Sequence, residues 1–225
     1  MTLPAAVLWD MDGTLVDTEP YWIAAEHQLV EGAGGTWSEE YAHQLVGNDL
    51  RVSAEFIRQH SPVDWEVDRI VDELLGKVTA RVRELVPWRP GARELLAELA
   101  REGVPSALVT MSWRVLADAV MDGLPAGTFP VVITGDEVEH GKPHPEPYLA
   151  AARALGVPPH RCVALEDSLT GVRSAVAAGV PTLAVPHVVS VPAVPGAVQV
   201  ATLLGLSAHR LGELAGLSET EPSST

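Results

Sequence analysis

Short apolar runs that alternate with helical patterns place the strongest constraint on the fold of this chain. Each run is only a few residues long and stops abruptly, which favours a buried strand over a helix. Five such runs occupy residues 5–9, 104–109, 131–134, 162–165 and 181–185. Helical patterns fill the intervals, as at residues 92–102 and 169–178, each followed by glycine. Strands that alternate with helices predict an α/β fold, in which a parallel sheet carries helices on both faces.

One long segment, residues 18–87, contains helical patterns and no convincing strand. Pro20 suits the first turn of a helix. Helical spacing then continues through Ile23, Ala24, His27 and Val30. Further helices are predicted at residues 38–46, 50–60 and 64–85. We interpret the segment as a helical insertion after the first strand, with hinges near residues 16–18 and 85–88.

The chain has 225 residues, which is enough for one domain with a modest insertion. We assign residues 1–17 and 88–218 to the core, residues 18–87 to the insertion, and residues 219–225 to a disordered polar tail.

No apolar run reaches the roughly 18 residues that a membrane-spanning helix needs, and the N-terminus lacks the basic region of a signal peptide. We therefore expect a cytoplasmic protein that does not bind membranes. A monomer is expected, with a homodimer as the alternative.

Composition excludes several kinds of partner and site. Cys162 is the only cysteine, so the chain can form neither an internal disulfide nor a multi-cysteine metal site. Its apolar neighbours predict a buried structural thiol. Thirty acidic residues against fifteen basic ones give a net charge of −15, and such a surface repels nucleic acid and anionic lipid. We expect no nucleic-acid partner, and any phosphate group must be held by a local site.

Two acidic pairs stand at the ends of predicted strands. Asp10 and Asp12 follow the first run, and Gly13 lets the chain turn sharply away. Glu166 and Asp167 follow the fourth run. The alternatives are an Asp-Gly turn with a spare aspartate for the first pair and solvated loop acids for the second. Because ligands bind at the carboxyl edge of a doubly wound sheet, both pairs are candidate site residues.

Two further elements offer groups that can hold a phosphate. Thr110 and Met111 follow the second run and precede a helix, so a hydroxyl and free backbone N–H groups form a phosphate-binding corner. An ordinary helix cap is the alternative. Lys142 lies in a loop stiffened by the proline after it, where a solvated lysine is the alternative. For His140 and His144, burial trends favour surface residues over metal ligands.

Together these elements predict a site for phosphoryl transfer. If the strands share one sheet, the four carboxylates converge at one edge, where they cannot all ionise without a cation. Oxygen ligands select a hard ion such as Mg²⁺. Lys142 and Thr110 add positive and hydrogen-bonding groups opposite the ion. Metal, ammonium and hydroxyl groups around a carboxylate nucleophile are what phosphoryl transfer needs, since it depends on charge neutralisation and positioning.

The four elements, in this order, resemble those of the haloacid dehalogenase (HAD) superfamily of phosphohydrolases. The resemblance covers residues 7–185 and places the insertion where some members carry an α-helical cap. It implies a Rossmann-like, HAD-like core with an inserted α-helical cap, and Mg²⁺ as the cofactor.

The resemblance also implies a role for each matching residue. Asp10 corresponds to the nucleophile that forms an aspartyl-phosphate, and Asp12 to the acid that protonates the leaving oxygen and then activates water. The phosphate-binding candidates are Thr110, Met111 and Lys142. The candidate metal ligands are Asp10, Asp12, Glu166 and Asp167.

Within the superfamily the chain is similar to sugar-phosphate and sugar-alcohol-phosphate phosphatases and to β-phosphoglucomutase, through residues 17–22 and 162–168. The mutase has a histidine in the cap hinge where this chain has Trp22. That departure favours hydrolysis of a small sugar or polyol phosphate and leaves a phosphomutase as the alternative. A non-enzymatic binding protein is the rival from another class, although no nucleophile or metal carboxylate is missing. The substrate-contact candidates in the cap are Trp22, Asn48, Asp49 and Arg51, with a solvated polar loop as the alternative.

Overall fold

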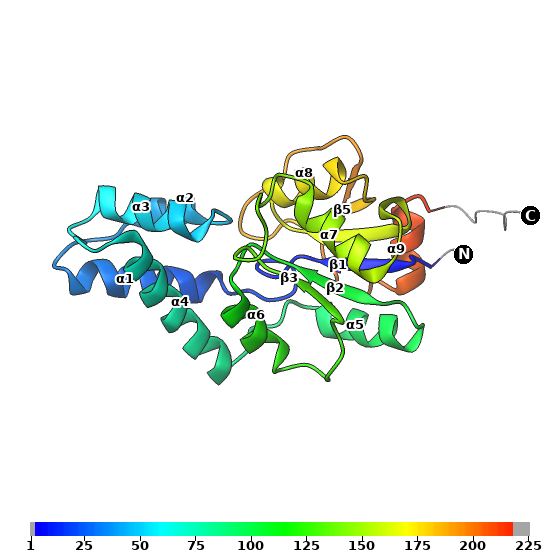
Figure 1. The fold of residues 1–225 in the computed structure, drawn as a ribbon, viewed down its shortest axis with the longest axis horizontal. Coiled ribbons are helices and arrows are strands. Elements are labelled where there is room, and N and C mark those ends of the chain that lie inside the picture. The colour runs from blue at the N-terminus through cyan, green and yellow to red at the C-terminus, as the bar shows by residue number, and fades with distance from the viewer. Residues whose placement is uncertain (1–2, 218–225) are drawn as a thin grey trace, which may run out of the picture.

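A computed structural model describes residues 3–217 and places a parallel sheet at the centre of the molecule (Figure 1). Within these residues the sheet has six strands in the order β3-β2-β1-β4-β5-β6, and every neighbouring pair is parallel. The strands are β1 (Ala6–Trp9), β2 (Ser106–Val109), β3 (Val131–Ile133), β4 (Cys162–Glu166), β5 (Thr182–Ala184) and β6 (Ala197–Gln199). The predicted α/β fold is confirmed. The order changes direction between β1 and β4, which is where such sheets bind ligands.

Five of these strands match the predicted apolar runs, and β6 does not. Its residues are half-buried or exposed and pair only at the edge of the sheet, so β6 lacks the buried apolar run that marks the other strands. Cys162 is buried in β4, and burial raises the pKa of its thiol to about 11, as expected for a structural cysteine. The predicted tail at residues 219–225 lies outside the described residues.

Helices cover both faces of the sheet. They are α5 (Ala92–Arg101), α6 (Arg114–Met121), α7 (Glu146–Leu155), α8 (Leu169–Ala177) and α9 (Ala208–Leu214), with a short 3₁₀ helix η1 (Pro159–Arg161) before β4. Val7 and Trp9 of β1 pack in one apolar cluster with α5, α6 and α9. Ala6 and Leu8 pack in a second cluster with α7 and α8. Since successive side chains of a strand point to opposite faces, β1 contributes to both cores.

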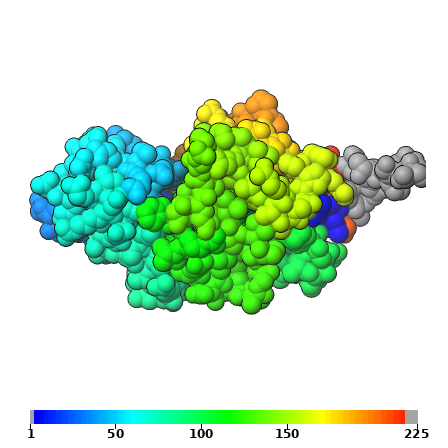
Figure 2. Space-filling view, viewed as in Figure 1, coloured from blue at the N-terminus to red at the C-terminus, as the bar shows by residue number. Residues whose placement is uncertain are grey.

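The predicted helical insertion is present between β1 and α5. It consists of α1 (Glu19–Gly32), α2 (Glu39–Leu45), α3 (Leu50–His60) and α4 (Val67–Glu84). Ser38 caps α2, because its side chain accepts a hydrogen bond from the backbone N–H of Tyr41 at 3.2 Å. These helices form the blue to teal end of the molecule in Figures 1 and 2. No helix within residues 3–217 is both long enough and apolar enough to cross a membrane.

Two connectors join the insertion to the core, and they lie side by side. The backbone N–H of Asp17 donates to the carbonyl of Pro87 at 2.8 Å, and that of Arg89 donates to the carbonyl of Leu15 at 3.0 Å. The two segments predicted as hinges are therefore neighbours in space.

The buried face of helix α1 differs from the face that the apolar spacing predicted. Its buried residues are Ala25, Glu26, Leu29 and Val30. Ala24, which the spacing assigned to the apolar face, is exposed, while Ile23 and His27 are half-buried. The physical reason is a contact that periodicity does not reveal. Glu26 turns inward and accepts a hydrogen bond from Nε1 of Trp37 at 3.0 Å.

The inward position of Glu26 predicts a pH-dependent stability. Burial raises the pKa of this carboxyl from 4.5 to about 7, although the Trp37 hydrogen bond opposes the shift. The folded protein therefore holds the proton more tightly than the unfolded chain does. Protonation of Glu26 therefore stabilises the folded protein relative to its state at high pH. This stabilisation is complete below about pH 4.5 and is lost as the pH rises through 7.

We expect Glu26→Gln to raise the free energy of unfolding at pH 8 by about 2 kcal/mol and to change it little at pH 4.5. Urea unfolding at both pH values measures the difference. Glu31→Gln is the matched control, because Glu31 is exposed on the same helix. An equal effect of Glu26→Gln at the two pH values would contradict the prediction.

Candidate active site

The carboxyl ends of β1, β2 and β4 bring the predicted site residues together. Asp10 follows β1, Thr110 follows β2, and Glu166 is the last residue of β4. Backbone pairing extends to the site, since the N–H of Asp10 donates to the carbonyl of Leu165 at 3.0 Å. Lys142 enters from the loop between β3 and α7. Residues more than 100 positions apart in the sequence therefore share one edge of the sheet.

The Lys142 ammonium group is the centre of this arrangement. Its Nζ donates to Asp10 Oδ1 at 2.6 Å, to Glu166 Oε1 at 2.5 Å and to the carbonyl of Val109 at 2.9 Å. The side chain is only 4% exposed, so it is not the solvated lysine considered as the alternative. Burial alone would lower the pKa of Lys142, but the Asp10 and Glu166 carboxylates raise it overall. The ammonium group is therefore charged at every pH at which the protein would work.

Three carboxyl groups gather beside this lysine. Asp10, Glu166 and Asp167 each offer an oxygen atom, and these atoms lie within 4.8 Å of one another. Burial, together with the charge of Glu166, raises the pKa of Asp10 to about 7, although Lys142 opposes the shift. Burial and the neighbouring charges of Asp10 and Glu166 also raise the pKa of Asp167. The protein holds more negative charge here than one ammonium group can balance.

The oxygen atoms of this cluster suit a hard divalent cation. Asp10 Oδ2 is buried and has no hydrogen-bond partner among the described residues. Gly13 leaves room for the Asp167 carboxylate, because a Cβ atom at position 13 would lie 1.9 Å from Asp167 Oδ2. Gly13 also has a φ of +86°, which favours glycine. All-oxygen donors with a free carboxylate oxygen fit Mg²⁺.

The Asp12 carboxylate is held by hydroxyl groups and is not part of the metal-ligand cluster. Oδ2 accepts hydrogen bonds from Ser112 Oγ at 2.7 Å and from Thr110 Oγ1 at 3.3 Å. Oδ1 accepts a hydrogen bond from the Thr18 hydroxyl. Ser112 therefore does not act as a helix cap, which was the alternative for this segment. Thr18 was not predicted, because its contact with Asp12 depends on the path of the connector after β1.

Glu166 has partners on both oxygen atoms. Besides Lys142, Oε1 accepts a hydrogen bond from Tyr148 Oη at 2.6 Å, and Oε2 accepts one from Ser168 Oγ at 3.2 Å. Burial and the charge of Glu166 raise the pKa of the Tyr148 hydroxyl, which stays protonated and donates. Glu166 therefore positions Lys142 from within the core. Tyr148 was not predicted, since a tyrosine on a helix facing the sheet carries no local signal of this contact.

A cleft of about 250 Å³ lies above the cluster, between the core and the helical insertion. Two of the predicted insertion contacts, Trp22 and Asn48, line it. Met111 also lines it, and the Met111 Sδ atom accepts a hydrogen bond from the backbone N–H of Lys142 at 3.1 Å. The cleft joins residues from α1, from the loop after α2 and from the sheet edge. Its volume suits a small metabolite.

The other two predicted insertion contacts, Asp49 and Arg51, have partners outside the described cleft lining. Arg51 forms an ion pair with Asp68 and places its guanidinium group over the Trp113 ring, 5.9 Å from the ring centroid. Asp49 caps α3, because its Oδ1 accepts a hydrogen bond from the backbone N–H of Arg51 at 2.9 Å. Neither residue is among the described cleft-lining residues, and their contact with substrate stays a prediction. The sequence could not show that Asp68, 17 residues later, lies within reach of Arg51.

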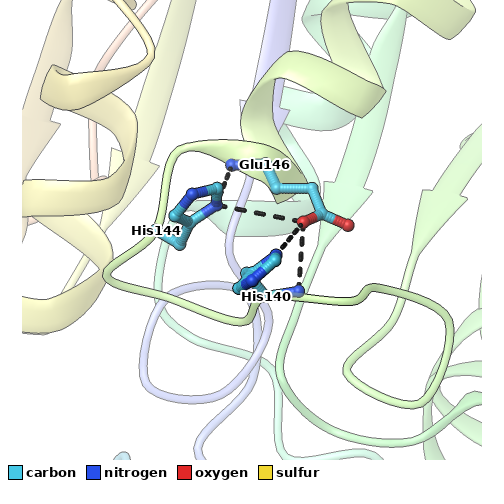
Figure 3. Close-up of side chains that lie close together, drawn as sticks. All are labelled: His140, His144 and Glu146. Atoms are coloured by element: carbon cyan, nitrogen blue, oxygen red, sulfur yellow. Dashed lines mark hydrogen bonds and ion pairs between the residues drawn. The ribbon is translucent and has the colours of Figure 1, made fainter.

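His140 and His144 flank Lys142 on the surface of the loop between β3 and α7 (Figure 3). Both are exposed, as predicted, and neither lines the described cleft. Their imidazole rings lie close to the carboxylate of Glu146, the first residue of α7. Glu146 is thus a third polar group beside the two histidines, which the sequence pattern did not predict.

Comparison with known proteins yields consistent matches over most of the chain. A sequence model of haloacid dehalogenase-like hydrolases matches residues 7–185. The chain is 32% identical to hexitol phosphatase B of Escherichia coli (strain K12) over 187 residues, covering 80% of this chain and 83% of that protein.

Solved structures match the fold closely. The crystal structure of CbbY from Rhodobacter sphaeroides in complex with phosphate has a TM-score of 0.84 at 30% identity, covering 93% of this chain and 99% of that chain. A mutant of the same protein in complex with xylulose-(1,5)bisphosphate has a TM-score of 0.83 at 29% identity, with the same coverage. Both alignments extend beyond the sheet to include the helical insertion, as their coverage requires.

The contact between Tyr148 and Glu166 predicts a measurable role for a single hydroxyl group. We expect Tyr148→Phe to lower the free energy of unfolding by about 1–3 kcal/mol, because it removes a buried hydrogen bond to a carboxyl group. Urea unfolding provides the measurement. Tyr21→Phe is the matched control, since Tyr21 donates to the carbonyl of Leu85 at an exposed position. Equal losses in the two variants would show that the Glu166 contact has no special importance.

Proposed function

This chain belongs to the haloacid dehalogenase-like hydrolase family, and we propose that it is a Mg²⁺-dependent phosphatase acting on a sugar or polyol monophosphate. In this proposal Asp10 accepts the phosphoryl group and forms an aspartyl-phosphate. The environment of Asp10 is the observation that carries the proposal. One of its carboxylate oxygens is held by Lys142 at 2.6 Å, and the other is buried without a partner in the described chain.

The first step would transfer the phosphoryl group from the substrate to Asp10. A carboxylate oxygen of Asp10 forms a bond to phosphorus as the bond from phosphorus to the leaving oxygen breaks. Asp12 gives its proton to that oxygen, which departs as an alcohol. Lys142 supports this step because its positive charge favours the ionised form of Asp10 and restrains its orientation.

The second step would hydrolyse the aspartyl-phosphate. Asp12 takes a proton from a water molecule, the water oxygen bonds to phosphorus, and the bond between phosphorus and Asp10 breaks. Inorganic phosphate leaves and both aspartates return to their starting forms. The hydroxyl groups of Thr18 and Ser112 support this role, because they hold the Asp12 carboxylate in one orientation.

Asp10 and Asp167 are the proposed carboxylate ligands for Mg²⁺, with Glu166 in the same cluster. When bound, the ion neutralises negative charge on the phosphate oxygens and on the carboxylates. The raised pKa values of Asp10 and Asp167 support this assignment, since groups that resist ionisation together gain from a nearby cation.

The substrate class follows from the cleft and from the relatives. Hexitol phosphatase B is named for activity on phosphorylated sugar alcohols. A cleft of about 250 Å³ between the two parts of the chain suits a ligand of that size. We propose that residues 18–87 act as a cap over the core, formed by residues 1–17 and 88–218. The cap would exclude water and contact the leaving group. A cytoplasmic monomer remains the expectation.

The alternatives receive less support. A phosphomutase must also hold an intermediate with two phosphate groups, and Trp22, which lines the cleft, stands where the mutase carries a histidine. A non-enzymatic binding protein would not need a buried lysine to restrain a carboxylate among the ligands of a cation. Hydrolysis of a monophosphate therefore remains the proposed function.

Hydrolysis of p-nitrophenyl phosphate with and without Mg²⁺ tests the proposal. Asp10→Asn should lower kcat by at least about 1,000-fold, because an amide cannot act as the nucleophile. EDTA should abolish the activity of the unmodified protein, and added Mg²⁺ should restore it. Asp122→Asn is the control, since Asp122 is exposed and lies outside the cleft.

Two results would contradict the proposal. Full activity of Asp10→Asn would exclude the aspartyl-phosphate mechanism. Conversion of a hexose 1-phosphate to its isomer, without release of phosphate, would identify a mutase.

A further inference from the structure

Two acidic side chains line the cap side of the cleft. Glu19 and Glu26 of α1 line it beside Trp22. Burial, together with the charges of Glu26, Asp12 and Asp17, raises the pKa of Glu19 to about 8. Glu26 is 5% exposed, with Oε2 bonded to Trp37. Acidic groups therefore extend from Asp12, the proposed general acid, into the helical cap.

The cleft offers no free basic side chain to balance a second anionic group. Only Lys142 and His187 are basic among the lining residues that the structure describes. Lys142 is already shared between two carboxylates, and His187 Nε2 lies 3.0 Å from Asp17 Oδ2. Arg51, the cap arginine nearest in sequence to the lining, is paired with Asp68.

We infer that Glu19 and Glu26 form a leaving-group subsite that selects an uncharged polyhydroxy alcohol and rejects one carrying a second phosphate or carboxylate. The inference rests on the proposed function, because it concerns the alcohol released in that reaction. Carboxyl groups, protonated or ionised, accept hydrogen bonds from hydroxyl groups. A second phosphate or carboxylate would lose its hydration without gaining a basic partner.

This selectivity would distinguish the chain from a structural relative. Crystals of a CbbY mutant hold xylulose-(1,5)bisphosphate, so a protein of this fold can accept a substrate with two phosphate groups. In the present chain the cap side of the cleft carries Glu19 and Glu26, and no free basic side chain is found among the described lining residues.

Phosphate release measured on four compounds tests the inference. They are p-nitrophenyl phosphate, sorbitol 6-phosphate, glucosamine 6-phosphate and fructose 1,6-bisphosphate. We expect kcat/KM for sorbitol 6-phosphate to exceed that for the bisphosphate by at least about 100-fold. Glu26→Gln should lower the ratio of kcat/KM for sorbitol 6-phosphate to that for p-nitrophenyl phosphate by about 10-fold. Glu31→Gln, on the exposed side of the same helix, should leave this ratio unchanged.

Other results would contradict either this inference or the proposed function. Equal rates on sorbitol 6-phosphate and the bisphosphate, or an unchanged ratio in Glu26→Gln, would overturn the inference while the phosphatase stands. A preference for glucosamine 6-phosphate would also overturn it, because the subsite would then select a cation. If p-nitrophenyl phosphate is not hydrolysed either, the proposed function itself fails.

An independent observation concerns the exposed loop beside Lys142 (Figure 3). His140, His144 and Glu146 each offer one ligand atom, and these atoms lie within 4.8 Å of one another. The two Nδ1 atoms lie 3.0 Å and 3.9 Å from Glu146 Oε2. Ligands bound to a tetrahedral zinc ion at about 2.0–2.1 Å lie about 3.3 Å apart, so small side-chain movements would complete such a site. The backbone N–H groups of Glu139 and His140 hold the carboxylate at 2.8 Å and 3.0 Å.

We propose that these three residues form a surface site for Zn²⁺, separate from the cation cluster at Asp10. Imidazole ligands select Zn²⁺ over Mg²⁺, which prefers oxygen. The three side chains are accessible to solvent, and a net charge of −15 favours the approach of cations. A bound ion would connect the residues two positions before and two positions after Lys142, and would restrain the loop that carries it.

Calorimetric titration of the whole protein with Zn²⁺, in excess Mg²⁺ to occupy the carboxylate cluster, tests this site. We expect one Zn²⁺ ion to bind per chain, and His140→Ala and His144→Ala each to weaken binding by at least about 10-fold. His160→Ala is the control, because His160 is exposed on η1. Both ligand variants should fold, since the two side chains are exposed. Unchanged affinity in these variants, or no binding by the unmodified protein, would overturn the proposal.

Discussion

One buried ammonium group among carboxyl groups determines the character of the candidate site. Lys142 bonds to Asp10 and Glu166, and Asp167 lies in the same cluster, so a single positive charge meets three acidic groups. Buried charges are tolerated only where they are paired and hydrogen-bonded. Lys142 offsets part of the negative charge and fixes the position of Asp10. The remaining acidity makes this edge of the sheet suitable for a divalent cation.

The parallel sheet supplies the geometry on which that charge balance depends. The strands β1, β2 and β4 end at the same edge, and their backbone pairing fixes the positions of Asp10, Thr110 and Glu166. The opposite wall of the cleft belongs to helices inserted between β1 and α5, which are joined to the core by two adjacent connectors. The groups proposed for chemistry therefore lie at the carboxyl ends of the strands or in the loops that follow them, and those proposed for substrate selection lie on the inserted helices.

Acidic side chains on both walls of the cleft have a cost in stability. Glu19 and Glu26 are held where burial disfavours their charged forms. Proteins commonly retain such destabilising groups at functional sites, since replacing them would improve the fold and impair the activity. The positions of these two carboxyl groups, facing the cleft beside the proposed general acid, agree with a role in contacting substrate.

The sequence by itself determined the α/β class, the helical insertion, and Asp10 and Lys142 as site candidates, because periodicity, turns and motifs are local properties. Only the tertiary structure decided which face α1 buries, that Tyr148 supports Glu166, and that Arg51 pairs with Asp68. Each of these depends on a partner that lies far along the chain or is reached only when helices pack. Local patterns state which groups are available, whereas packing and charge pairing decide which of them meet.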